Sequence, residues 1–398
     1  MTAKGPLHGL KVLDLTRILA GPTATQLLGD LGAEVIKIEN PATGGDDTRS
    51  WGPPYVRDTE DQPTDLSAYF VSANRNKLSV AADIATDEGQ ALVAALAAQS
   101  DVVIENFKPG GLAKFGLDAE TLLNRHPGLV YCSISGYGQT GPNASKPGYD
   151  LMAQGYGGIM SLTGEPDGAP MKVGVGIADV MCGMYACIGV LSALRHRDAT
   201  GEGQHIDVSL VDSQIAWLIN EGVNYLTSGQ VPERRGNGHP NIVPYNVFAT
   251  SDGHVIVAVG NDAQFRRFCG VLGAPDLADD PRFATNPDRI ANRAELAPLI
   301  ELLLAARTSA EVISGLEMAK VPVGPVQTLD QVFSSDQVAA RGMQIEIARD
   351  DVDGGAVRMI GNPLKLARTP VTYRHPPPRF GQDTETVQKR IKQDDTSA

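Results

Sequence analysis

The first 135 residues of this chain alternate between strand-like and helix-like segments, and this pattern limits the possible fold more than any other feature. Apolar strands are predicted at residues 10–15 and 33–39, with a helix at 22–31 between them. These three segments have the length of one βαβ unit. A helix follows at 88–99, with strands at 101–105 and 129–134. Alternation of this kind predicts an α/β fold, with a Rossmann-like parallel sheet covered by helices on both faces.

Ligands of such sheets bind beyond the carboxyl ends of the strands, which directs attention to the loops at 16–21, 106–111 and 135–147. The first loop lacks the GxGxxG pattern, so NAD and FAD are disfavoured. Asn106, Phe107 and Lys108 directly follow a predicted strand, and Lys114 lies a little further on. An amide, an aromatic ring and two cations could bind adenine and phosphates, although a solvated surface loop is the simpler interpretation.

The composition changes at residues 232–244, which are rich in proline, glycine, arginine and asparagine. A hairpin is then predicted at 247–250 and 255–259 from its Asp-Gly turn, and helices at 264–272, 291–306 and 309–320. We expect a large domain at 1–226 with a returning segment at 331–398, and a smaller α+β domain at 227–330. A strand is predicted at 205–209 and one helix at 210–226. The polar tail from Gln382 is predicted to be disordered.

Composition narrows the range of partners and compartments. The 398 residues carry a net charge of −13, which argues against nucleic acid and anionic membranes. Four cysteines without a CxxC pair, and no apparent secretion signal, predict a reducing cytoplasmic location. The apolar run at 180–194 is predicted to be too short to span a bilayer. The seven histidines form no HxxxH or HExxH pattern, so no metal site is predicted.

Asp179 precedes this longest apolar run of the chain. An aspartate in that position either caps a buried helix or is kept ionised and dry for a chemical role. The residues alone leave both interpretations open. Tyr149 and Asp150 form a phenol–carboxylate pair upstream. Gly260 and Asn261 follow the hairpin, where their N–H groups could either bind an oxyanion or cap the next helix.

Together these segments resemble the class III CoA-transferases, also called the CaiB/BaiF or formyl-CoA transferase-like family. The resemblance runs from about residue 6 to 381, and its most specific stretches are residues 20–22, 31–39, 74–77, 105–107, 135–138 and 200–204. Residues 44–54 and 242–245 look most like the succinyl-CoA–dicarboxylate branch, which includes succinate–hydroxymethylglutarate (glutarate) CoA-transferase.

The resemblance implies covalent catalysis by Asp179. Its carboxylate would attack an acyl-CoA to give a mixed anhydride, and the CoA thiolate would then form an aspartyl-CoA thioester with the enzyme. Coenzyme A would be a substrate, and no metal or permanently bound cofactor would be needed. We expect Asp179 to be ionised at neutral pH unless burial raises its pKa by about 3 units or more, a shift that a helix N-terminus would oppose.

The family also implies an interlocked homodimer and a set of ligand contacts. The implied CoA contacts are Ile18, Ala82, Asp83, Asn106, Phe107, Lys108 and Lys114. The implied contacts of the acyl group are Trp51, Tyr69, Tyr149, Asp150, Gly260 and Asn261. The arginines considered for the distal carboxylate of a dicarboxylic acid are Arg17, Arg49, Arg234 and Arg235.

Two other functions remain as alternatives. The related α-methylacyl-CoA racemases have a histidine base where this chain has Tyr149, and a phenol is a poor base at neutral pH. A non-catalytic acyl-CoA binder would keep the pocket but would not depend on Asp179.

Overall fold

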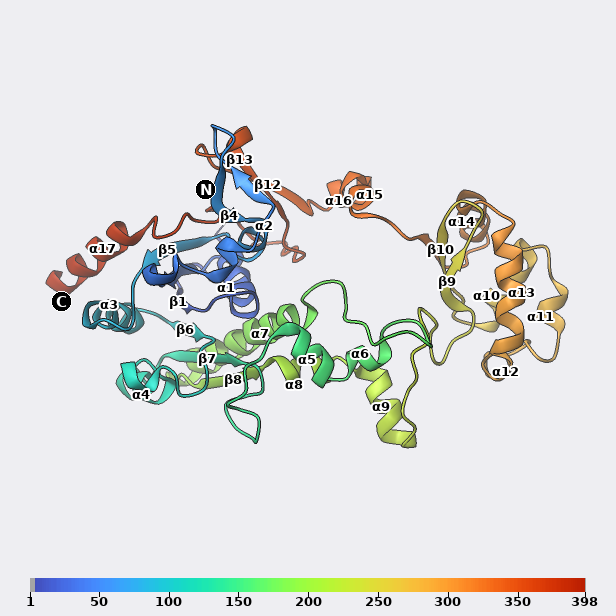
Figure 1. Cartoon of the computed structure of the whole chain (residues 1–398), viewed down its shortest axis with the longest axis horizontal. Coiled ribbons are helices and arrows are strands. Elements are labelled where there is room, and N and C mark those ends of the chain that lie inside the picture. Colours follow the sequence, from blue (N-terminus) through green and yellow to red (C-terminus); the bar gives the residue numbers. More distant parts are fainter. Residues whose placement is uncertain (1–3, 398) are drawn as a thin grey trace. The chain divides into compact units, whose positions relative to one another are not determined.

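The computed structural model describes residues 4–397, which form two compact units (Figure 1). The larger unit contains the chain up to Ile159, Lys172–Gln230 and the chain from Gln337 onward. The smaller unit contains Met160–Met171 and Val231–Asp336.

The larger unit is built on a six-stranded sheet in the order β5-β2-β1-β6-β7-β8, with every neighbouring pair parallel. The strands are β1 (Lys11–Leu15), β2 (Glu34–Glu39), β5 (Lys77–Ala81), β6 (Val102–Glu105), β7 (Val130–Ser135) and β8 (His205–Ser209). Numbered among themselves, these strands follow the 3-2-1-4-5-6 order of the Rossmann fold. The predicted parallel sheet is confirmed. The order reverses between β1 and β6, so the loops after these two strands flank the crevice where such folds bind ligands.

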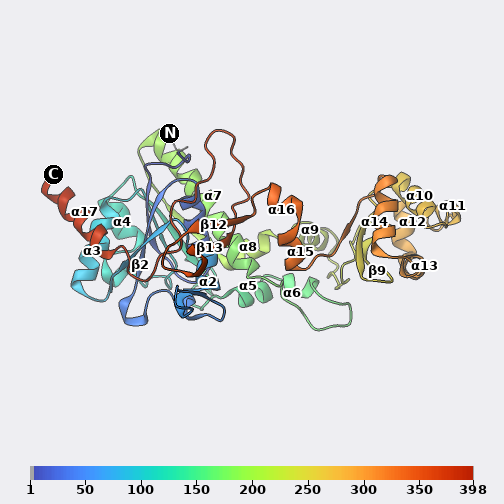
Figure 2. The ribbon, with the colours of Figure 1, turned by 90° about the horizontal axis from the view of Figure 1, so that it is seen from above.

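Helices cover both faces of this sheet, as the alternation predicts (Figure 2). One face packs against α1 (Ala20–Asp30) and α7 (Ile177–Thr200). The other packs against α3 (Asp87–Ala98), α4 (Ala119–Arg125) and α17 (Thr384–Ser397). The remaining helices of this unit are α2 (Ala68–Ala73), α5 (Asp150–Tyr156), α8 (Leu210–Ala216), α9 (Ile219–Ser228) and most of α16 (Asp336–Ala340). Two antiparallel hairpins complete it, β3 (Tyr55–Arg57) with β4 (Pro63–Ser67), and β12 (Gln344–Ala348) with β13 (Ala356–Ile360).

Gly183 allows α7 to pack very closely against α1. A Cβ atom at Gly183 would lie 2.5 Å from the carbonyl oxygen of Ala20 and 2.9 Å from the side chain of Thr23. Only glycine fits this approach without displacing backbone. The first turn of α7, which carries Asp179, is therefore held in a fixed position relative to the start of α1.

The length argument against a membrane span was wrong for α7. The helix has 24 residues and is long and apolar enough to cross a bilayer by length and composition. However, more than half of its most apolar stretch is buried within the protein, as in a core helix.

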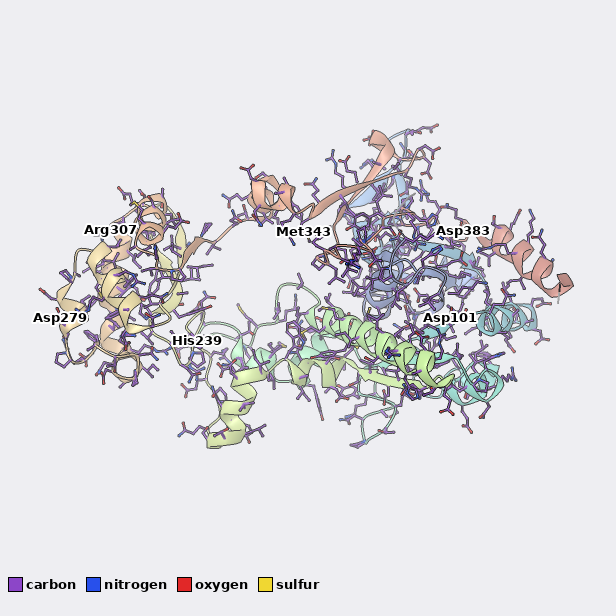
Figure 3. The ribbon with its side chains drawn as sticks, turned by 180° about the vertical axis from the view of Figure 1, so that it is seen from behind. Asp101, His239, Asp279, Arg307, Met343 and Asp383 are labelled. Carbon is purple, nitrogen blue, oxygen red and sulfur yellow. The ribbon has the colours of Figure 1, made fainter. Side chains whose placement is uncertain are left out.

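Two further predictions need correction. The predicted helix at 210–226 is broken between α8 and α9, where Ile219 has a positive φ of 38°. The predicted disorder of the tail from Gln382 is wrong for the described residues 384–397, which form α17 and bury Val387 and Ile391 in the core beside α3. The Asp383 carboxylate also accepts a hydrogen bond from the Ser79 N–H at 2.9 Å, which fixes the tail to edge strand β5 (Figure 3).

The smaller unit contains a three-stranded antiparallel sheet in the order β11-β10-β9, which confirms the predicted hairpin. Its strands are β9 (Tyr245–Ala249), β10 (His254–Ala258) and β11 (Val323–Pro325). The three predicted helices are confirmed as α10 (Asp262–Val271), α13 (Arg293–Ala305) and α14 (Ser309–Met318). The short helices are α6 (Ile159–Leu162), α11 (Asp276–Asp279), α12 (Asn286–Ala291) and α15 (Leu329–Ser334). This unit has its own apolar core.

A candidate active site around Asp179

Asp179 lines a cavity of about 470 Å³ at the carboxyl edge of the parallel sheet. The loops after β1, β6 and β7 form its walls, as the reversal of strand order predicts. A smaller cavity of about 190 Å³ lies beside it and shares Arg17 and Phe107 with it. The predicted site residues that line the larger cavity are Ile18, Trp51, Asn106, Phe107, Lys108, Tyr149 and Asp179. Ala82 lines the smaller one.

Asp179 does not cap its own helix. Gly176 is the N-cap residue of α7 and Asp179 is the third residue of the helix. The cap comes from Asp150 in α5, whose Oδ1 atom accepts hydrogen bonds from the N–H groups of Ala178 at 2.9 Å and Asp179 at 3.4 Å. The capping interpretation of Asp179 is therefore wrong, and its side chain remains available for chemistry.

The Asp179 carboxyl lies in a poorly solvated environment. Burial and then the nearby charge of Asp150 raise the pKa of Asp179 from 3.8 to about 7. Among residues 4–397, no group donates a hydrogen bond to this carboxylate. This rise is about as large as the 3 units beyond which ionisation at neutral pH is no longer expected, and it occurs because Asp150 occupies the helix N-terminus that would have opposed it. Once ionised, a carboxylate without donors is a stronger nucleophile than a hydrogen-bonded one.

Two aromatic residues from neighbouring elements meet beside this carboxyl. The rings of Trp51 and Tyr69 pack edge to face with their centres 5.1 Å apart. Burial, followed by the charge of Asp179, raises the pKa of Tyr69 to about 12. Tyr69 is therefore a neutral phenol at physiological pH, which can donate a hydrogen bond but does not act as a base.

Tyr149 and Asp150 have different surroundings although they are adjacent. Tyr149 lines the cavity and is 59% exposed. Both carboxylate oxygens of Asp150 are engaged, Oδ1 at the start of α7 and Oδ2 with the side-chain amide of Gln154 at 2.7 Å. The structure therefore makes Asp150 a helix cap rather than part of the cavity wall.

The loop after β6 contributes three of the predicted CoA contacts. Asn106 faces the loop after β1, Phe107 lies between the two cavities, and Lys108 lines the larger one. Asp83 and Lys114 line neither cavity. Asp83 accepts a hydrogen bond from the N–H of Ala85 at 2.9 Å, and the Lys114 Nζ lies 4.6 Å from the centre of the Phe115 ring.

Sequence reasoning missed Lys146, which lines the Asp179 cavity. The signal was a cation at the end of the glycine-rich loop after β7. Of the four arginines considered for a distal carboxylate, Arg17 lines the cavity. Arg49 is buried and paired with Glu39 at 2.7 Å and Asp65 at 2.8 Å, while Arg234 donates to the carbonyl oxygens of Glu165 and Gly168.

Gly260 and Asn261 belong to the smaller unit and make local contacts there. The Asn261 side chain caps α10 by accepting the Gln264 N–H at 2.9 Å. The Gly260 N–H donates to the Gln264 side chain at 2.7 Å. The helix-cap interpretation of this loop therefore describes its contacts within the unit.

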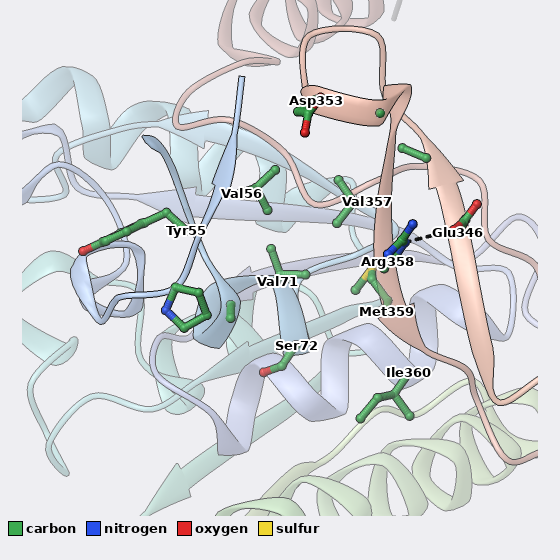
Figure 4. Close-up of a pocket in the computed structure, with 14 residues that line it drawn as sticks. Tyr55, Val56, Val71, Ser72, Glu346, Asp353, Val357, Arg358, Met359 and Ile360 are labelled. Carbon is green, nitrogen blue, oxygen red and sulfur yellow. Dashed lines mark hydrogen bonds and ion pairs between the residues drawn. The ribbon is translucent and has the colours of Figure 1, made fainter. Parts of the chain in front are cut away.

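A larger cavity of about 610 Å³ lies between the β3–β4 hairpin and the β12–β13 hairpin (Figure 4). Its walls are mostly apolar and include Val56, Val71 and Val357. Its one ion pair joins Glu346 to Arg358 at 3.1 Å. It shares no lining residue with the Asp179 cavity. Within residues 4–397, no cluster of three or more His, Cys, Asp or Glu side chains could hold a metal ion.

Comparison with known proteins defines the class to which this fold and cavity belong. Residues 7–384 match the profile of CoA-transferase family III. The succinate–glutarate CoA-transferase of Agrobacterium fabrum is 47% identical over 384 residues, covering 96% of this chain and 95% of that protein. The succinyl-CoA:glutarate CoA-transferase of Homo sapiens is 40% identical, covering 99% and 87% respectively.

A solved structure agrees with this result. The crystal structure of a CAIB/BAIF family protein from Brucella suis matches with a TM-score of 0.86 and 47% identity, covering 98% of this chain and all of that one. The chain is therefore an enzyme of the transferase class. It belongs to CoA-transferase family III, which confirms the resemblance seen in the sequence.

Proposed function

We propose that this enzyme transfers coenzyme A from succinyl-CoA to a short dicarboxylic or hydroxy-dicarboxylic acid. The observation that carries the proposal is the Asp179 carboxylate, which is buried, free of hydrogen-bond donors and open to a cavity that includes three cations. These cations are Arg17, Lys108 and Lys146. The similar enzymes of Agrobacterium fabrum and Homo sapiens, named for succinate or succinyl-CoA and glutarate, support these substrates.

The reaction balances through three covalent intermediates on Asp179, two anhydrides and one thioester. One carboxylate oxygen of Asp179 attacks the thioester carbonyl of succinyl-CoA and releases the CoA thiolate, which leaves a mixed anhydride. The thiolate attacks the aspartyl carbonyl, which releases succinate and gives an enzyme–CoA thioester. The acceptor carboxylate displaces CoA to form a second anhydride. The thiolate then attacks the acceptor carbonyl, giving the new acyl-CoA and free Asp179.

Coenzyme A would occupy the two adjacent cavities. Phe107 lies between them, which suits an adenine ring, and Ala82 lines the smaller one. Lys108 and Lys146 would bind phosphates. Ile18, Asp83, Asn106 and Lys114 complete the proposed CoA set. Trp51, Tyr69 and Tyr149 would surround the acyl group, with Asp150 behind the nucleophile. Gly260 and Asn261 stay in the proposed set as acyl contacts that the family resemblance implies.

We also propose that the enzyme is an interlocked homodimer in the cytoplasm. Large apolar side chains on α7 and α9 are exposed within one chain, including Ile188, Ile219 and Leu226, the last of which is 80% exposed. An apolar surface of this kind usually contacts another protein. All four cysteines are free and buried, which suits a reducing compartment.

Mass spectrometry tests the proposal directly. The enzyme is mixed with succinyl-CoA and a panel of dicarboxylic acids, and new thioesters and the intact protein are both analysed. We expect glutaryl-CoA or a similar product, and a CoA adduct on Asp179 that is absent in Asp179→Ala. Full turnover by Asp179→Ala would contradict the mechanism. Exchange of deuterium at the α-carbon without CoA transfer would instead identify a racemase.

A further inference from the structure

The loop that follows β1 is held by side chains from four separate parts of the chain. The Thr16 N–H donates to the Asp14 carboxylate at 2.8 Å, and the Thr16 carbonyl oxygen accepts from the Lys37 ammonium at 2.7 Å. Asn106 holds the next residue at both ends. Its Oδ1 accepts the Arg17 N–H at 3.1 Å, and its Nδ2 donates to the Arg17 carbonyl oxygen at 2.7 Å.

The third residue of this loop, Ile18, has an unfavourable backbone. Its φ is +73°, in the left-handed region that β-branched side chains rarely adopt. The Ile18 N–H donates to the Asp46 carboxylate at 3.2 Å. Strained residues of this kind persist only where their surroundings fix them, and they occur most often at functional sites. Ile18 lines the Asp179 cavity, so the strain lies at the candidate active site.

Asp46 is itself fixed by a buried ion pair. The Lys37 ammonium lies 2.9 Å from the Asp46 carboxylate, and both side chains are fully buried. Asp46 also accepts hydrogen bonds from the N–H and hydroxyl groups of Thr48 at 3.0 and 2.7 Å. Lys37 thus connects the Thr16 carbonyl to the carboxylate that holds Ile18.

We infer that Lys37, Asp46 and Asn106 are positioning residues that hold Ile18 in its left-handed conformation and so set the affinity of the cavity for coenzyme A. This inference rests on the proposed function, since it takes coenzyme A as the occupant of the cavity. It also changes the expected role of Asn106. The side-chain amide of Asn106 is engaged at both ends by Arg17 and acts through the loop rather than on the ligand.

The conformation of Ile18 provides a specific test, because glycine adopts a positive φ without strain. Calorimetry measures the dissociation constant of free coenzyme A for wild type, Asp46→Ala, Ile18→Gly and the double variant. We expect Asp46→Ala to weaken binding by about tenfold, the order set by the strain of one backbone residue. In the Ile18→Gly background, adding Asp46→Ala should cause little further loss. Losses that multiply in the double variant would overturn the inference.

Asn106→Ala, combined with Ile18→Gly, provides a second double-mutant cycle. Asn106 is only partly buried, so this variant should fold even if Asp46→Ala does not. A loss that persists in the Ile18→Gly background would show that Asn106 contacts coenzyme A directly, contrary to the inference. The matched control is Asp101→Asn, which weakens the ion pair of Asp101 with Arg197 at 2.8 Å, outside both cavities (Figure 3). This control should bind coenzyme A as wild type does.

Hydrogen exchange on the unliganded protein separates this inference from the proposed function. A peptide covering residues 15–21 should exchange faster in Asp46→Ala and Asn106→Ala than in wild type, and no faster in Asp101→Asn. Unchanged exchange in both loop variants would overturn the inference even if coenzyme A binds. A wild-type enzyme that does not bind coenzyme A would instead overturn the proposed function, while the exchange result would still decide how the loop is held.

Discussion

The carboxylate of Asp150 caps the helix that carries Asp179, with its Oδ1 atom 2.9 Å from the Ala178 nitrogen and 3.4 Å from the Asp179 nitrogen. Two carboxylates thus lie at one helix N-terminus in different environments. Asp150 takes the hydrogen bonds of the helix end, and Asp179 is left with burial and a neighbouring negative charge. Pairs of carboxyl groups with such different environments are typical of sites where one of the two groups reacts.

Replacing Asp179 by asparagine should stabilise the protein at neutral and alkaline pH. The pKa of Asp179 is raised from 3.8 to about 7 by burial and then by Asp150. The folded state therefore binds this proton more tightly than the unfolded state, and the carboxyl lowers stability progressively as pH rises through that interval. The gain in Asp179→Asn should approach at most about 4 kcal/mol above about pH 7 and vanish below about pH 4.

Thermal unfolding of wild type and Asp179→Asn across this pH range measures the effect. Equal melting temperatures of the two proteins at about pH 8 would show that the buried Asp179 carboxylate does not destabilise the folded state. Asp101→Asn also removes a negative charge but lines neither cavity and loses the ion pair with Arg197, so it should not raise the melting temperature.

Asp150→Asn and Asp150→Ala should have separable effects. Asparagine keeps an oxygen that accepts the Ala178 N–H but removes the charge, so the pKa of Asp179 should fall below about 7. For wild type, kcat/KM should rise with pH to half its maximum at the Asp179 pKa of about 7. That midpoint should move to lower pH in Asp150→Asn. Alanine also removes the cap and should cost about 1 kcal/mol of stability. An unshifted pH profile in both variants would contradict the electrostatic link.

The cations of the Asp179 cavity should act mainly on phosphate binding. Lys108→Ala and Lys146→Ala should each weaken coenzyme A binding by several-fold, with a smaller effect at high salt. Neither should affect pantetheine, which lacks the nucleotide phosphates. Lys114→Ala is the comparison, because Lys114 lines neither cavity and should have a smaller effect. Calorimetry with both ligands makes this measurement, and equal losses for coenzyme A and pantetheine would argue against phosphate contacts.

Arg289 should be essential for the stability of the smaller unit. Its guanidinium is fully buried, donates to the carbonyl oxygens of Val243 and Phe283, and pairs with Asp262 at 2.8 Å. Arg289→Met should destabilise this unit by about 2–4 kcal/mol, because buried carbonyl groups lose their donors. Asp262→Asn should cost much less, since Asp262 is half-exposed. Calorimetric unfolding distinguishes the two variants, and similar melting curves would contradict this account.

The parallel sheet could be predicted because buried strands and amphipathic helices leave strong periodic patterns. β8 at His205–Ser209 begins and ends where the sequence places it. The secondary-structure predictions failed where tertiary contacts override the local composition. Most residues of α17 are polar, but Val387 and Ile391 are buried against β5 and α3, and this packing cannot be predicted from the local composition. The break between α8 and α9 likewise leaves no proline or glycine signal.

For the site, the sequence predicts Asp179 as the reacting group and the structure places it in the cavity, but the raised pKa of its carboxyl could not be predicted. The capping role of Asp150 depends on the packing of α5 against α7, which no local pattern encodes. Lys146 was missed although it stands in the glycine-rich loop after β7, because a lysine in a loop is usually solvated. Asn106 was predicted as a site residue and lines the cavity, but its two hydrogen bonds to Arg17 become visible only when the loops after β1 and β6 are placed side by side.

The absence of a side chain at Gly183 affects how the enzyme can accommodate the successive intermediates of the proposed reaction. Because α7 touches the backbone of α1 there, we expect Asp179, the proposed nucleophile, and the beginning of α1 to shift together. The anhydride and the thioester differ in size and in the direction of attack. In the proposed reaction, the acyl chain and the thiol end of coenzyme A would therefore move while Asp179 stays almost stationary. Mobility during turnover should be concentrated in these two parts of the substrates.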